Sequence, residues 1–113
     1  MPDTSKPDSP PGFSPDRFAP GAEAAERFLK QLANRNRLMV LCALSEGEKS
    51  VAELNALIPL SQSALSQHLA RLREEQLVRV RSQGRVNYYL LCDPRAAKLL
   101  ATLHELFCEE GTQ

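Results

Sequence analysis

Apolar residues recur at helical spacing from about residue 22 onward, which predicts a helix with one apolar stripe. The members of this stripe are Ala25, Phe28, Leu29 and Leu32. A second helix is predicted to follow, with Asn34 or Asn36 as its N-cap, because asparagine side chains accept hydrogen bonds from free backbone amides. Its apolar positions run from Leu38 to Leu44, and residues 45–47 mark its end.

Two further helices are predicted, separated by a short connection. The sequence Ser-Val-Ala-Glu at residues 50–53 is a capping box, in which the serine hydroxyl and the glutamate carboxylate each accept from a backbone amide. Pro59 ends that helix, because the residue before a proline disfavours helical backbone angles. Ser61 then caps a longer helix, which is expected to run to about Gln76. The inward-facing positions of the pair are predicted to be Val51, Leu54, Leu57, Ile58, Ala64, Leu65, Leu69 and Leu72.

After Leu77 apolar and polar residues alternate, which is typical of β-strands. The alternation runs through residues 78–81, breaks at the turn sequence Ser-Gln-Gly-Arg of residues 82–85, and resumes over residues 86–91. A β-hairpin is therefore predicted. The Asp-Pro pair at residues 93–94 can cap and start a last helix, because proline suits the first helical position. The apolar positions of this helix are Ala96, Leu99, Leu100, Leu103, Leu106 and Phe107.

A short helix, a turn, a longer helix and a hairpin, in this order, form the layout of a winged helix-turn-helix. The predicted fold class is therefore mainly α with a small β-hairpin (α+β). In this fold the second helix of the pair enters the major groove of double-stranded DNA. Its outward face carries polar and small residues and no acid before Glu74. The predicted DNA-binding residues of this face, called the reading face below, are Gln62, Ser63, Ser66, Gln67 and Arg71.

The residue types of the reading face suit DNA, because glutamine pairs with adenine edges, serine with bases or phosphates, and arginine with guanine or phosphate. The overall charge of the chain does not indicate a binding partner, because 14 basic side chains balance 14 acidic ones. Residues 61–85, however, contain five arginines against two glutamates, a net charge of +3. Arg79, Arg81 and Arg85 fall on or near the edge and tip of the hairpin, where they can contact the DNA backbone or minor groove.

Two alternatives remain for the reading face. It can be an ordinary solvated surface, or part of a winged helix that binds proteins and never touches DNA. A protein-binding face would be expected to be more apolar. His68 is predicted to point partly toward the core as a hydrogen-bonded structural residue, with a base contact as the alternative.

Composition predicts one domain with short tails. Residues 1–20 hold six of the eight prolines and little that is apolar, which cannot offset the entropy of ordering the chain. We expect a disordered tail at 1–20, the DNA-binding and dimerisation domain at 21–108, and a short tail at 109–113. No apolar run approaches the roughly 20 residues of a membrane span, and no secretory signal is present. A cytoplasmic protein without a membrane partner is expected, in which Cys42, Cys92 and Cys108 are reduced.

The sequence LSQSALSQHLARLR at residues 60–73 resembles the ArsR family of bacterial repressors, as do residues 32–38, 77–78 and 84–90. The resemblance covers roughly residues 22–108. It implies a homodimer built on the first and last helices, and an inducer that releases operator DNA. We do not expect an enzyme. The rival class, a thiol oxidoreductase, has no Cys-x-x-Cys, glycine-rich loop or paired carboxylates to support it.

Many members of this family sense metals, but both family patterns are broken here. One pattern places Cys-x-Cys on the first helix of the pair, where residues 51–57 contain no thiol. The other uses an Asp and a His at the start of the last helix and a His and an acid near its end. Asp93 is followed by Arg95 in place of the His, and His104 by Phe107 in place of the acid. Neither metal site is expected.

Cys42 and Cys108 resemble the cysteine pair of the branch that responds to persulfides and oxidants (the SqrR, BigR and HlyU group). This resemblance implies neighbouring helices and thiols that join as a disulfide or polysulfide when reactive sulfur species or oxidants induce the protein. Cys92 has no counterpart and is interpreted as a spectator. Cys42 taken alone can also be a small buried hydrophobe. The second alternative is a metal-responsive repressor using Cys42, His104 and Cys108, since His104 and Cys108 share a helix face.

Overall fold

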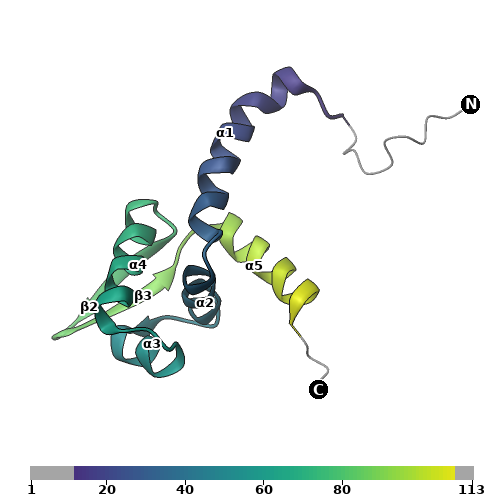
Figure 1. Ribbon diagram of the computed structural model, residues 1–113. Coiled ribbons are helices and arrows are strands. Elements are labelled where there is room, and N and C mark those ends of the chain that lie inside the picture. Colours follow the sequence, from purple (N-terminus) through teal and green to yellow (C-terminus); the bar gives the residue numbers. More distant parts are fainter. Residues whose placement is uncertain (1–11, 109–113) are drawn as a thin grey trace, which may run out of the picture.

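The computed structural model describes residues 12–108 (Figure 1). The helices are α1 (Pro15–Leu32), α2 (Arg35–Leu44), α3 (Val51–Leu57), α4 (Gln62–Glu74) and α5 (Pro94–Phe107), and the strands are β1 (Lys49–Ser50), β2 (Val78–Gln83) and β3 (Val86–Leu91). We call α2, α3, α4 and the sheet the head of the molecule. Figure 1 shows that α1 and α5 both extend from this head toward one side. The predicted fold class, mainly α with a small hairpin, is confirmed.

Side-chain caps begin four of the helices, three at the predicted residue and α2 at Asn34, one of the two predicted candidates. The capping residues are Asn34, Ser50, Ser61 and Asp93. Each accepts a hydrogen bond from an amide in the first turn of its helix, which satisfies a donor that the helix itself leaves free. Glu53 completes the capping box of α3, because its carboxylate accepts from the Ser50 amide at 2.8 Å. The helix then ends at Leu57, close to Pro59, as predicted.

The sheet contains the predicted hairpin and one strand that was not predicted. β2 and β3 pair antiparallel, with Val78 opposite Leu91 and Gln83 opposite Val86. Gly84 lies in their connection with a φ of 65°, an angle that costs glycine nothing because it lacks a Cβ. β1 pairs with the other edge of β3, so the strand order is β1-β3-β2. Two residues are too few to produce an alternating pattern, which is why sequence analysis missed β1.

Leucine and valine side chains from all five helices and from β2 fill one core. The fully buried side chains include Val40, Leu41, Leu54, Leu65, Leu69, Leu72, Leu77 and Val78. The prediction that Leu57 faces the core is wrong, because 58% of this residue is exposed. Ile58, which was also predicted to face inward, is buried, and its backbone at the end of α3 is extended.

Helix α1 begins earlier than predicted. It starts at Pro15, so residues 15–20, which were assigned to the disordered tail, are helical. Pro15 is compatible with a helix start because the first turn needs no hydrogen bond from its nitrogen. The rest of the predicted tails, residues 1–11 and 109–113, lies outside the described residues. Within residues 12–108, no helix is long and apolar enough to cross a membrane.

Candidate nucleic-acid interface and thiol site

Helices α3 and α4 form the helix-turn-helix, and a side chain of α3 fixes the turn between them. The Asn55 amide donates to the Leu60 carbonyl at 2.7 Å. Ser61 then accepts from the Ala64 amide at 3.1 Å and starts α4. These two hydrogen bonds fix where α4, the helix that carries the reading face, begins relative to α3.

The reading face of α4 is exposed, as the helical spacing predicted. Leu65, Leu69 and Leu72 are fully buried on the opposite side of the helix. The exposed residues are Gln62, Ser63, Ser66, Gln67 and Arg71. Glutamine, serine and arginine side chains thus project together from one face, and their donors and acceptors are of types suited to base edges.

The three wing arginines differ in their surroundings. Arg79 and Arg85 are exposed and form no salt bridge or side-chain hydrogen bond with another described residue. Arg81, by contrast, donates to both carboxylate oxygens of Glu48, at 2.9 and 2.7 Å. These bonds lower the pKa of the Glu48 carboxyl. Arg81 also donates to Gln83 at 3.0 Å, so three of its five N–H groups are engaged and its charge is offset by the Glu48 carboxylate.

Cys42 and Cys108 line one open groove between α2 and α5, with a volume of about 640 Å³. Cys42 lies on α2, and Cys108 is the C-cap residue of α5. Both are free thiols and both are exposed. Leu57 lines the same groove, which accounts for its exposure. Two cysteines that are 66 positions apart in the sequence (108 minus 42) therefore share one site.

The two thiols have different neighbours. Partial burial raises the pKa of the Cys42 thiol, and the charges of Cys108 and Glu46 raise it further. The Cys108 sulfur lies 3.0 Å from the His104 Nδ1 atom, one helical turn earlier on α5. An imidazole at this distance can accept the thiol proton and so generate the nucleophilic thiolate.

The arrangement does not support the metal alternative. Among residues 12–108, no group of three or more His, Cys, Asp or Glu side chains lies close enough together to hold a metal ion. Cys42, His104 and Cys108 therefore do not form a three-ligand site within one subunit. Cys92 does not line the groove of the other two thiols, and its sulfur contacts the Gln76 carbonyl at 3.5 Å.

His68 is a hydrogen-bonded, half-buried residue, as predicted. Its Nδ1 atom accepts from the Arg37 Nε atom at 3.3 Å. Arg37 also donates through Nη1 to the Gln31 side chain at 3.0 Å. Sequence analysis assigned no role to Arg37 or Gln31, because contacts between different helices leave no mark on the periodicity of any one of them.

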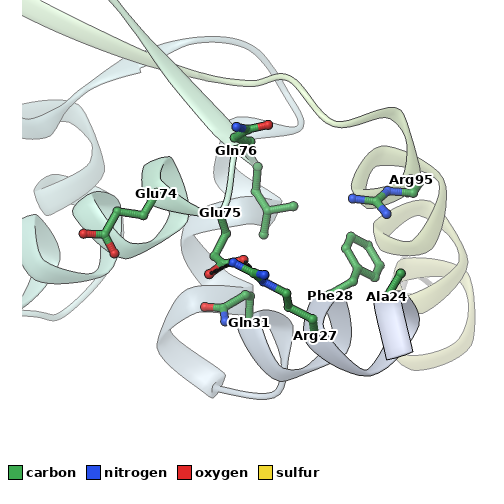
Figure 2. A pocket seen from close by; sticks show the side chains of 9 residues that line it. Ala24, Arg27, Phe28, Gln31, Glu74, Glu75, Gln76 and Arg95 are labelled. Carbon is green, nitrogen blue, oxygen red and sulfur yellow. Dashed lines mark hydrogen bonds and ion pairs between the residues drawn. The ribbon is translucent and has the colours of Figure 1, made fainter. Parts of the chain in front are cut away.

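A small pocket of about 280 Å³ lies where α1, the end of α4 and the start of α5 meet (Figure 2). Figure 2 shows that Arg27 of α1 points toward the carboxylate of Glu75 in this pocket. The Arg27 Nε and Glu75 Oε1 atoms lie 2.9 Å apart. Arg95 stacks over the Phe28 ring on the other side, 4.8 Å from its centre. Its guanidinium is held by Asp93 at 2.7 Å. Both arginines of the pocket are thus already paired with carboxylates of the same chain.

Comparison with known proteins places the chain in one family. The family described as "Bacterial regulatory protein, arsR family" matches residues 34–80. The chain is 44% identical over 82 residues to the transcriptional activator HlyU of Vibrio cholerae, covering 73% of this chain and 76% of the relative. It is 36% identical over 106 residues to a biofilm growth-associated repressor of Xylella fastidiosa, covering 94% and 93%.

Solved structures agree with this placement. The crystal structure of the transcriptional repressor BigR from Xylella fastidiosa matches with a TM-score of 0.79 at 36% identity, covering 86% of this chain and 99% of that one. Reduced HlyU from Vibrio cholerae matches with a TM-score of 0.76 at 40% identity, covering 85% and 100%. The chain therefore belongs to the ArsR family and is a transcriptional regulator of the winged helix-turn-helix type.

Proposed function

We propose that this regulator is a homodimeric repressor that binds operator DNA and is released when Cys42 and Cys108 are bridged. The inducer is a reactive sulfur species or another oxidant, and the bridge is a disulfide or polysulfide. One observation carries this proposal: the two thiols, on α2 and at the end of α5, line the same groove. A bridge there links the head to α5.

The DNA-binding part of the proposal rests on the reading face and the wing. The reading face carries base-compatible side chains on a helix whose other side is buried. Arg79 and Arg85 add positive charge beside it on the exposed wing. Positive side chains near the docked helix favour DNA through its phosphates, whatever the sequence.

The dimer part of the proposal rests on apolar side chains that the single chain leaves exposed on α1 and α5. These are Phe18, Leu29, Leu106 and Phe107. Phe107 is 75% exposed, and large apolar side chains grouped on two helices are typical of an association surface. A two-fold dimer would present two copies of α4 to major grooves about 34 Å apart.

When the inducer is a persulfide, its sulfane sulfur is the oxidant that forms the bridge. In the first step the Cys108 thiolate attacks the outer sulfur of a persulfide, RSSH, which gives Cys108–SSH and releases RS⁻. His104 accepts the Cys108 proton before this step. The Cys42 thiolate then attacks the sulfur bonded to the Cys108 carbon chain, which forms the disulfide and releases HS⁻. If Cys42 is itself persulfidated first, the same attack leaves one additional sulfur in the bridge and again releases HS⁻.

Peptide mapping by mass spectrometry tests this assignment. After treatment with a persulfide donor, we expect one cross-linked peptide pair that joins residues 42 and 108 of a single chain, with Cys92 alkylated as a free thiol. Mixing isotopically heavy and light protein before treatment distinguishes links within a chain from links between chains. A heavy–light cross-link through Cys92 would contradict the proposal.

The wing offers a second prediction. Arg79→Ala should weaken binding to every DNA sequence alike and reduce the salt slope of log K by about one ion, because it removes one phosphate contact.

For Arg81, Glu48→Gln is the informative change, since it removes the competing carboxylate. If Arg81 contacts phosphate, as we propose, Glu48→Gln should tighten binding and steepen the slope.

The comparison is made by mobility shift at several salt concentrations. The matched control is Arg81→Ala, which should weaken binding to all sequences. If Glu48→Gln instead weakens binding as much as Arg81→Ala does, the ion pair is needed to hold the wing, and Arg81 does not contact DNA.

A further inference from the structure

Arg37 joins three helices through one side chain. It lies in the first turn of α2, where its own amide donates to the Asn34 cap at 3.1 Å. Its guanidinium donates to Gln31 of α1 at 3.0 Å and to His68 of α4 at 3.3 Å. Gln31 is only 8% exposed, so its side chain has little access to water as an alternative partner. We call these three residues the Arg37 bridge.

The Arg37 bridge connects the proposed dimerisation helix to the reading helix. A second connection lies about two turns further along α4, where Arg27 of α1 holds Glu75 (Figure 2). Figure 2 also shows Gln31 beside this ion pair, and both line the same pocket. Helix α1 thus contacts α4 near its middle through Arg37 and directly at its C-terminal end. Two separated points of attachment restrict rotation of α4 relative to α1 more than either does alone.

The bridge requires a neutral His68. The Nδ1 atom accepts the Arg37 hydrogen bond, so it carries no proton, and the proton of the neutral ring is on Nε2. Burial lowers the pKa of His68, and the charge of Arg37 lowers it further. Two of the charged residues that follow His68 in the sequence are Arg71 and Glu75. Arg71 lies three positions later on α4, and Glu75 lies seven positions later at the end of this helix, where its carboxylate is paired with Arg27. Gln31, the partner from α1, is uncharged.

We propose that Arg37 and His68 are positioning residues for DNA binding, which hold α4 at a fixed orientation to α1 and release it when His68 is protonated. This inference rests on the proposed role of α4 in DNA binding and is independent of the thiol site. Protonated His68 cannot accept the hydrogen bond, and it places a second positive charge beside Arg37.

The direction of the pH dependence follows from the lowered pKa of His68. Because the folded state binds this proton less readily than the unfolded chain does, the bridge is intact at neutral pH. Its contribution is fully present above about pH 6.5, the ordinary pKa of histidine, and is lost as the pH falls through the lower pKa of His68 in the folded protein. The added charge of a protonated histidine would by itself change DNA affinity in the opposite direction, since a positive charge near DNA strengthens binding.

The test measures binding to a duplex that the protein itself selects from a randomised pool. Binding is titrated between about pH 8 and pH 5 at constant ionic strength with reductant present, the range in which histidines change charge. We expect wild-type affinity to fall about tenfold on acidification, the effect of losing one hydrogen bond to a charged group. His68→Asn should bind like wild type at neutral pH and lose this fall, because the asparagine oxygen can accept from Arg37 but does not titrate.

Arg37→Lys is the second variant, because it keeps the positive charge but cannot donate to both partners in fixed geometry. It should bind weakly already at neutral pH, while binding to a scrambled duplex is unchanged. The inference is overturned if wild type and His68→Asn show parallel pH profiles, or if Arg37→Lys binds as tightly as wild type. If the wild type selects no duplex from the pool, the DNA-binding proposal itself fails, which is a different result.

Discussion

Replacing either Cys42 or Cys108 with serine is expected to leave operator binding intact and to abolish release by a persulfide donor. Both residues are exposed and neither belongs to the core, so the substitution should not disturb the fold. Either thiol alone can be modified, but only the two together can form a bridge within the subunit. We therefore expect the inducer response to disappear completely in each variant, rather than to weaken.

Cys92→Ser is the matched control for this prediction. It removes an exposed thiol that lies outside the groove shared by the other two, and it should respond to the inducer as wild type does. Operator binding is measured by mobility shift with and without the donor. Full release of the Cys108→Ser protein would show that the proposed bridge is not the switch.

The second large effect is expected at the reading face. Gln67→Ala should weaken binding to the selected duplex by about 1–3 kcal/mol, because a bidentate contact between glutamine and adenine discriminates by this amount. Binding to a scrambled duplex should change little, since the contact is made only with the correct base. The measurement is a pair of titrations, one with each duplex, at the same salt concentration.

Arg79→Ala serves as the contrast for Gln67→Ala. A phosphate contact should affect both duplexes equally, whereas a base contact should affect only the selected one. If Gln67→Ala weakens both duplexes alike while Arg79→Ala changes sequence preference, the roles assigned to α4 and the wing are reversed.

Local signals were sufficient to predict most of the fold. Asn34, Ser50, Ser61 and Asp93 all cap helices, because a cap depends on residues that are adjacent in sequence. The change from helical to alternating spacing after Leu77 likewise predicted the hairpin. These patterns identified the reading helix and which of its faces is exposed.

Contacts between distant residues could not be predicted in the same way. Glu48 holds Arg81 across 33 positions of sequence, and nothing in the spacing of either residue indicates this pair. The exposure of Leu57 has a similar origin. Helical periodicity placed this residue inward, but it lies at the end of α3, where the groove between α2 and α5 opens.

The thiol site shows what resemblance adds to pattern analysis. Periodicity assigned Cys42 to an apolar helix, where a small buried hydrophobe was a reasonable interpretation. Only the resemblance paired it with Cys108. The common groove now supports that pairing, because both cysteines and His104 line it.

The most direct test of the account is one titration of the selected duplex with the same preparation of wild-type protein before and after persulfide treatment. We predict that the reduced protein binds the selected duplex tightly and in a salt-dependent way. After treatment, its affinity for the selected duplex should be no higher than its affinity for a scrambled duplex. Adding reductant to the treated sample should restore the original affinity, because the bridge is reversible. Treated protein that carries the Cys42–Cys108 bridge and still binds the selected duplex at full affinity would contradict the account.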